Sequence, residues 1–260
     1  MSQAKKKGEV AVVAKTAIVV QDDVPDYIKQ GAQRGSENVT TNDIAIPRLE
    51  VIQGLSPAVK RGDPGYIQGA QVGTFINSVS KELYGEEVFI VPIYYTKQYL
   101  VWKMRKRADG TPVEGNGGFF GAFNTEQEAN ERCDREGGTA KDIEVIDTPQ
   151  HFCLLVRADG TAEEIMISMP KTKAKVSRQW NSMIRMADGD RFSRAYKMKT
   201  VLEKNPKGDF YNFEVALAGF PSRDIYAQAE KTYTVIAAGD RRVVMDVSDF
   251  DDAEDRDVEM

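Results

Sequence analysis

The chain has 260 residues, of which 41% are hydrophobic and 29% charged, and a formal net charge of −5 at pH 7. This composition is typical of a folded soluble protein with a substantial core, and no apolar run approaches the roughly eighteen residues of a membrane span. The two cysteines and single histidine exclude a disulfide framework and a Cys/His zinc site, so we expect a cytoplasmic protein.

The N-terminal 42 residues are polar and lack sustained periodicity, so 1–42 is predicted to be a flexible segment. Its basic start is not followed by a continuous apolar core, which is unlike a signal peptide. A single folded domain is expected over 43–240, and the acidic end, 241–260, is predicted to be disordered.

The first long strand pattern is EEVFIVPIYYTKQYLVWK at 86–103, which is rich in β-branched and aromatic residues. Pro92 predicts either an edge position or a bulge for this strand. The text that follows is basic and then glycine-rich, so 104–148 is predicted to be an insertion between strands. Within it, 124–138 is predicted to be a short helix, and 115–123 either a mobile aromatic flap or a disordered loop.

The remainder alternates between hairpins and helices. The predicted elements are a hairpin at 151–170, a helix at 171–187, a hairpin at 191–220 and a helix at 221–239. The helix at 171–187 is amphipathic, with Trp180 on its apolar face. The strand that opens the second hairpin is expected to place Phe192 and Tyr196 on one face, because residues two apart share a side of a strand.

This order predicts a protein that is mainly β with α elements, in the α+β class. Without the insertion and the last helix it resembles the OB-fold plan of three strands, a helix and two strands. We therefore expect an elaborated OB-fold-like β-barrel with helices and an insertion.

Charge is unevenly distributed along the chain. Residues 171–200 contain nine Lys or Arg and two acids, a net charge of +7. The last fifteen residues contain eight acids and one Arg, a net charge of −7, so the rest of the chain is mildly basic at +2. Clustered cations bind phosphates by releasing condensed counterions, and aromatic side chains stack on exposed bases. The pattern favours nucleic-acid binding.

The layout resembles that of the single-stranded DNA-binding proteins of tailed bacteriophages. The segments IPRLEVIQGLSPAVKRGDPG, KVSRQWNSMIRM and DRFSRAYKM also resemble segments of phage replication-associated proteins. The resemblance implies an OB-fold with a basic and aromatic groove, and an acidic tail, Asp246 to Glu259, that contacts replication proteins in the infected host cell. Tails of that class often end in an aromatic residue, whereas Phe250 is internal here and Met260 is last.

We accordingly expect a non-enzymatic, largely sequence-independent single-stranded DNA-binding protein that needs no cofactor and acts in phage DNA replication or recombination. The candidate DNA contacts are Lys97, Trp102, Lys103, Arg105, Lys173, Lys175, Arg178, Arg185, Arg191, Arg194, Tyr196, Lys197, Lys199 and Tyr211. The sequence leaves the oligomeric state open, with a homodimer among the possibilities.

Three other functions stay open. The first is a strand-annealing recombination protein, and the second is a phage structural or host-interaction protein that does not bind DNA. The third is a metal-dependent nuclease that uses Asp188 and Asp190 of the segment ADGD, although such a segment is more typical of a turn. His151 and Cys153 lie two apart in a predicted strand and share a face, which is more typical of ordinary strand residues than of a catalytic pair.

Overall fold

The computed structural model describes residues 11–12, 19–20, 34–40, 44–104, 111–113, 118–136, 142–205 and 208–239. Contacts divide the chain into two units, Met1–Thr40 and Thr41–Met260. In the first unit, β1 (Ala11–Val12) and β2 (Val19–Val20) pair in antiparallel fashion. The acidic tail, 241–260, lies outside the described residues.

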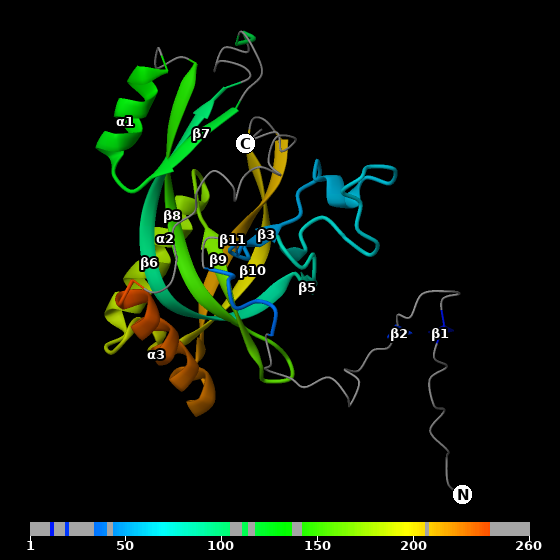
Figure 1. The fold of residues 1–260 in the computed structure, drawn as a ribbon, viewed down its shortest axis with the longest axis vertical. Coiled ribbons are helices and arrows are strands. Elements are labelled where there is room, and N and C mark those ends of the chain that lie inside the picture. Colours follow the sequence, from blue (N-terminus) through cyan, green and yellow to red (C-terminus); the bar gives the residue numbers. More distant parts are fainter. Residues whose placement is uncertain are drawn as a thin grey trace, which may run out of the picture. The chain divides into compact units, whose positions relative to one another are not determined.

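The second unit is built on a six-stranded antiparallel sheet (Figure 1). Its strands are β6 (Glu87–Lys103), β7 (Gly118–Phe123), β8 (Ile143–Val156), β9 (Ala162–Ser168), β10 (Ala195–Asn205) and β11 (Gly208–Gly219). The strand order is β11-β10-β6-β8-β9, and β7 pairs with the C-terminal part of β6.

Smaller elements surround this sheet. They are a three-stranded sheet of β3 (Leu49–Val51), β4 (Phe75–Asn77) and β5 (Leu83–Gly85), the helices α1 (Glu126–Arg135), α2 (Lys173–Met186) and α3 (Arg223–Ala237), and the 3-10 turns η2 (Pro57–Val59) and η3 (Arg191–Ser193). At the outer end of β6 and β8, α1 packs beside β7 (Figure 1).

Alternate residues of the strands supply two cores, one on each face of the large sheet. Cys153 and Leu155 of β8 pack with Trp180 of α2 and with residues of the three-stranded sheet. Phe152 and Leu154, one position out of phase, pack against α3 instead. The strand period of two therefore buries β8 on both faces, which explains why its sequence is almost continuously apolar.

The α+β class is confirmed, but neither of the two sheets in the second unit closes into a barrel among the described residues. The two ends of the strand order, β9 and β11, are not paired with each other. Instead, the outer edge of β9 is covered by the chain before β3, where the Met166 N–H donates to the Pro47 carbonyl oxygen at 2.8 Å. The structure thus supports the class without supporting an OB-fold barrel specifically.

Of the two roles predicted for Pro92, the bulge is correct and the edge position is wrong. β6 lies between β10 and β8, and its register with β8 shifts between Pro92 and Tyr94. A bulge disrupts the ladder locally, which lets a residue without an N–H sit inside a sheet.

The predicted helices are confirmed with small changes at their ends. Helix α1 begins after Thr125, whose hydroxyl accepts from the Glu128 N–H in a capping box. Helix α3 begins after Ser222, whose hydroxyl accepts from the Ile225 N–H. In α2, Trp180 is fully buried, as its place on the apolar face predicts.

Two local predictions are wrong. Residues 191–193 form η3 rather than the start of a strand, and this turn changes the phase of the side chains. Phe192 consequently packs on the α3 side of the sheet while Tyr196 packs on the α2 side. In the predicted insertion, 118–123 is a paired strand rather than a flap, and β8 already begins at Ile143.

Candidate nucleic-acid interface

The outer face of α2 carries three exposed cations in one stripe. Lys175, Arg178 and Arg185 are spaced by three and seven residues, so the helical period brings them onto the side opposite Trp180. No ion pair joins any of them to another residue in the described part of the chain. The α2 stripe, as we call these three residues, therefore presents positive charge that no ion pair within the described residues neutralises.

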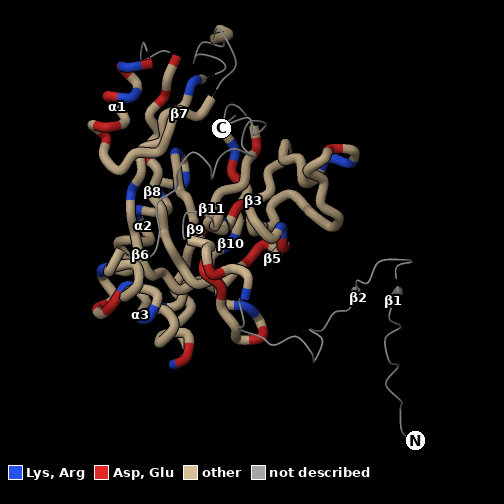
Figure 2. The backbone as a smooth tube through the Cα atoms, viewed as in Figure 1, with Lys and Arg blue, Asp and Glu red and all other residues tan. Residues whose placement is uncertain are grey.

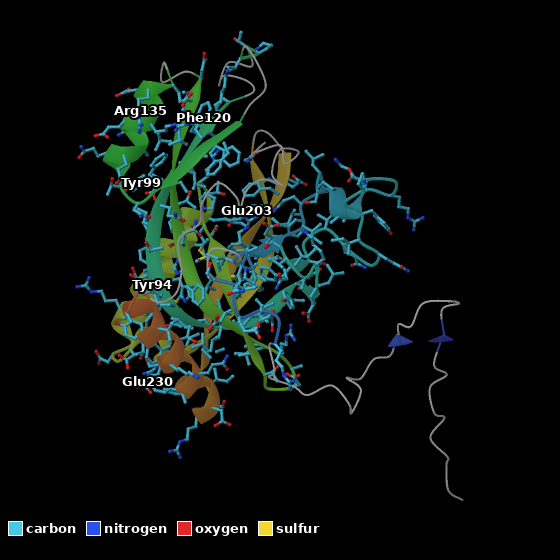
Figure 3. All side chains as sticks on the ribbon, viewed as in Figure 1. Tyr94, Tyr99, Phe120, Arg135, Glu203 and Glu230 are labelled. Carbon is cyan, nitrogen blue, oxygen red and sulfur yellow. The ribbon has the colours of Figure 1, made fainter. Side chains whose placement is uncertain are left out.

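A groove of about 530 Å³ runs between α2 and the ends of β10 and β11. Lys171 and Lys175 line it from the helix side, and Val176 and Phe213 supply apolar surface. Glu203 and Glu214 line it from the strand side, and Glu203 is labelled on β10 in Figure 3. The groove has one basic and one acidic wall, so only its α2 side attracts a phosphate.

Lys173 lies at the N-terminal end of α2 with its ammonium 4.6 Å from the centre of the Phe213 ring. Burial lowers the pKa of Lys173 to about 8, and the carboxylate of Glu50 opposes that shift. A lysine with such a pKa loses its charge just above neutral pH. Lys173 therefore anchors α2 on β11, and it does not line the groove.

Most other cations of the basic segment are paired with acids from neighbouring strands. Lys197 forms an ion pair with Glu87 at 3.2 Å, and Lys199 forms one with Glu214 at 2.9 Å. Lys171 bonds Glu144 at 3.2 Å. Figure 2 shows acidic and basic positions interspersed along the elements rather than separated onto one side. The charge of +7 in the sequence thus does not become one continuous surface, and the exposed excess belongs to α2.

Arg191 is held inside the protein by a polar cluster centred on the single histidine. Its guanidinium lies 2.8 Å from His151 Nδ1 and donates to Asn181 Oδ1 at 2.9 Å. Because an arginine can only donate, Nδ1 must be the unprotonated nitrogen, and Nε2–H donates to the Ser177 hydroxyl at 2.8 Å. Ser177 therefore has no base to activate it, and the cluster has the chemistry of a structural network.

The comparison with protein families decides where this chain belongs. The family described as Pam3 phage gp34-like protein matches residues 13–242. The chain belongs to this family. A search of curated proteins and a search of solved structures each found no match. A phage origin follows from the family, while its description names no activity.

In this family member, the aromatic residues predicted from the sequence to contact DNA differ in how far they are buried. Tyr196 is 1% exposed and packs edge-on against Trp180, so its ring is not available at the surface. Tyr211 is half-buried and its backbone is bonded to the side chain of Gln53. Trp102 is half-buried against Phe119, with ring centres 4.7 Å apart.

The second predicted basic segment lies toward the C-terminal end of β6, on a different element from the α2 stripe. Lys97 bonds Asp147 at 2.9 Å, Lys103 is half-buried at the end of β6, and Arg105 lies outside the described residues. Figure 3 places Tyr99 and Phe120 at this same end, beside α1. The structure thus does not join the two predicted segments into a single groove.

The segment ADGD forms the turn that ends α2, with a positive φ at Asp188 and Gly189. The Asp190 carboxylate accepts a hydrogen bond from the Tyr226 hydroxyl at 3.0 Å. Within the described ranges, no three His, Cys, Asp or Glu residues gather as a metal site would require. A search of the described helices finds none long and apolar enough to cross a membrane.

One surface residue escaped the sequence analysis. Phe220, just after β11, is 75% exposed, and the Arg194 guanidinium carbon lies 4.4 Å from the centre of its ring. The only signal was its place directly before Pro221, where strand pairing ends. Its partner Arg194 was predicted from charge alone.

Proposed function

We propose that this Pam3 phage gp34-like family member binds single-stranded DNA along α2 without strong sequence preference. The proposal rests on the α2 stripe. Lys175, Arg178 and Arg185 are exposed on a packed helix and form no ion pair with an acid among the described residues. They span ten residues, or about 15 Å of helix axis. Such a row follows a phosphate backbone and contacts no base edge, so it favours binding that tolerates any sequence.

Single strands are favoured because they leave bases free to stack. Phe220, whose ring is 75% exposed beside the Arg194 guanidinium, is the aromatic side chain that we assign to stacking. Tyr196 and Arg191 are not part of the proposal, because both are committed to the interior. The binding mode does not depend on a closed OB-fold barrel.

The acids around the groove set the expected strength of binding. Glu203 and Glu214 oppose the α2 stripe, so we expect modest affinity with a marked dependence on salt. The acidic tail, Asp246 to Glu259, would contact basic replication proteins in the cytoplasm of the infected host cell.

The test is fluorescence anisotropy with a labelled oligo-dT and a matched duplex, titrated at several salt concentrations. Replacing Lys175, Arg178 and Arg185 by Gln should weaken binding and reduce the salt slope by about 2, since each lost single-strand phosphate contact removes about 0.7. The matched control replaces three exposed cations elsewhere by Gln, namely Arg61, Arg223 and Lys231.

Each outcome decides something. An equal loss of affinity in both triple variants would contradict binding along the α2 stripe, because the overall charge alone would then explain the affinity. No binding of the native chain at low salt would overturn DNA binding altogether and favour a structural or host-interaction protein. Accelerated pairing of complementary strands would favour an annealing protein, and probe cleavage in Mg²⁺ that is lost on Asp188→Asn and Asp190→Asn would favour a nuclease.

A further inference from the structure

β11 lies at one end of the strand order of the large sheet. β11 pairs with β10 in a regular register from Tyr196–Leu217 to Asn205–Gly208. Its other side has no strand partner in the described part of the chain, whereas the opposite sheet edge at β9 is covered by Pro47 and Arg48. An open edge presents backbone donors and acceptors to any strand that can approach.

Hydrogen bonds identify which backbone groups of β11 point outward. The Tyr211 N–H donates to Gln53 Oε1 at 2.9 Å, and its carbonyl accepts from Gln53 Nε2 at 3.0 Å. The groups of Tyr211 thus face away from β10, and alternation in an antiparallel ladder makes Phe213, Val215 and Leu217 face the same way.

Only half of this edge is covered. The Gln53 side chain already bonds the outward N–H and carbonyl oxygen of Tyr211, and the Phe213 N–H donates to the Asn212 side-chain oxygen at 2.8 Å. The outward groups of Val215 and Leu217 have no hydrogen-bond partner among the described residues. The side chain of Leu217 is also 59% exposed.

Two features that often prevent strands from pairing, basic residues and prolines, are absent from β11. β11 contains no Lys, Arg or Pro, and Ala216, Leu217 and Ala218 are all exposed. Natural sheet edges commonly carry such charges or prolines as a guard against association. An unguarded, partly apolar edge is typical of a surface that is covered by a partner.

We propose that two copies of this chain pair in antiparallel fashion through β11, with the twofold axis at Ala216. Val215 of each copy then lies opposite Leu217 of the other, and each such pair exchanges both of its N–H···O bonds. Ala216 faces Ala216 of the second copy in the non-hydrogen-bonded position, where Cα atoms are about 4.5 Å apart and small side chains fit best.

The register of the proposed pairing follows from which backbone groups of β11 are still free to bond. A shift toward Tyr211 would require the Gln53 bonds to break. A shift toward Gly219 would use residues beyond the irregularity at which Gly219, rather than Ala218, is paired with Ala195.

A second copy suits this edge because the pairing complements itself. Leu217 packs on Val215 of the second copy, and since Val215 already contacts the α2-side core, the apolar layer continues across the axis. Glu214 lies opposite Ala218, so the pairing brings no like charges face to face. Such a twofold interface uses the same patch on both copies.

The test of the register is site-directed cross-linking of the full chain without nucleic acid. In a Cys133→Ser background, where only the fully buried Cys153 remains, Ala216→Cys should give a disulfide-linked dimer under mild oxidation. Ala218→Cys is the matched control: its two copies would be four residues out of register, about 13 Å apart along the strands. Cross-linking at 218 with none at 216 would overturn the proposed axis.

The test of the interface is light scattering of the native chain and of two exposed-leucine variants. The native chain and Leu202→Lys should be dimeric, whereas Leu217→Lys should be monomeric with an unchanged circular dichroism spectrum. Leu202 is the control because it is similarly exposed, at 54%, but lies opposite the covered part of β11. A native chain that stays monomeric at every concentration, or a dimer that Leu217→Lys does not affect, would overturn the proposal. Either result is independent of DNA binding.

Discussion

His151 lies where four elements meet, and its environment fixes its chemistry. Trp180 of α2 stacks on the imidazole at 4.5 Å, and Tyr95 of β6 approaches it edge-on at 5.1 Å. Its two ring nitrogens are hydrogen-bonded to Arg191 of η3 and to Ser177 of α2. Burial, followed by the nearby Arg191 charge, holds the pKa of His151 well below its usual value. A protonated His151 would place two cations in contact within the core.

This depressed pKa predicts a loss of stability in mild acid. Below about pH 6.5 the unfolded chain binds a proton at this position and the folded chain does not, so the free energy of unfolding falls by up to about 1.4 kcal/mol per pH unit. Above that pH both states are neutral and the effect vanishes. Because His151 is the only histidine, urea unfolding between pH 7 and 5.5 reports on it directly. His151→Gln should abolish most of this slope, and an equal slope in that variant would contradict the assignment.

At the scale of elements, close packing between the segment before β4 and β11 depends on one glycine. Gly73 has φ of +86°, and a Cβ there would lie 2.6 Å from a ring carbon of Tyr211. The Gly73 carbonyl also accepts from the Thr200 hydroxyl of β10 at 2.8 Å. The three-stranded sheet therefore docks on the β10–β11 hairpin through backbone that cannot accept a side chain.

Gly73→Ala is accordingly expected to lower the free energy of unfolding by about 2–4 kcal/mol, through backbone strain and displacement of Tyr211. Gly69→Ala is the control, because Gly69 has the same φ of +86° and nothing within 4 Å of a built Cβ. Chemical denaturation of both variants separates strain from collision. Equal losses would mean that contact with Tyr211 contributes nothing.

At the scale of the whole molecule, opposite charges are separated along the chain. The last fifteen residues carry a net charge of −7, and the α2 stripe presents exposed positive charge on the folded unit. Charges of opposite sign on one chain attract at low salt and are screened as salt rises. We therefore expect a tail of this charge to compete with nucleic acid for the same cations.

Ending the chain at Val244 is expected to strengthen oligo-dT binding at low salt and to have little effect at high salt. The comparison uses the same anisotropy titration for the full and shortened chains. Unchanged affinity at low salt would show that the tail does not compete. Weaker binding of the shortened chain would contradict the electrostatic argument outright.

The sequence by itself determined the local elements of this protein. The period of apolar residues predicted α2 and α3, and Pro92 predicted a bulge as one of two alternatives. These features depend on neighbours within a few positions, which a sequence displays directly.

Only the tertiary structure decided which predicted contacts are available at the surface. Lys197 and Lys199 are paired with Glu87 and Glu214, which lie on other strands, and Arg191 turns inward to His151. The strand order, which also depends on long-range contacts, leaves β11 at an edge with no further strand partner among the described residues, and the large sheet does not close there. Charge compensation, burial and strand order join residues far apart in the chain, so composition and periodicity could not reveal them.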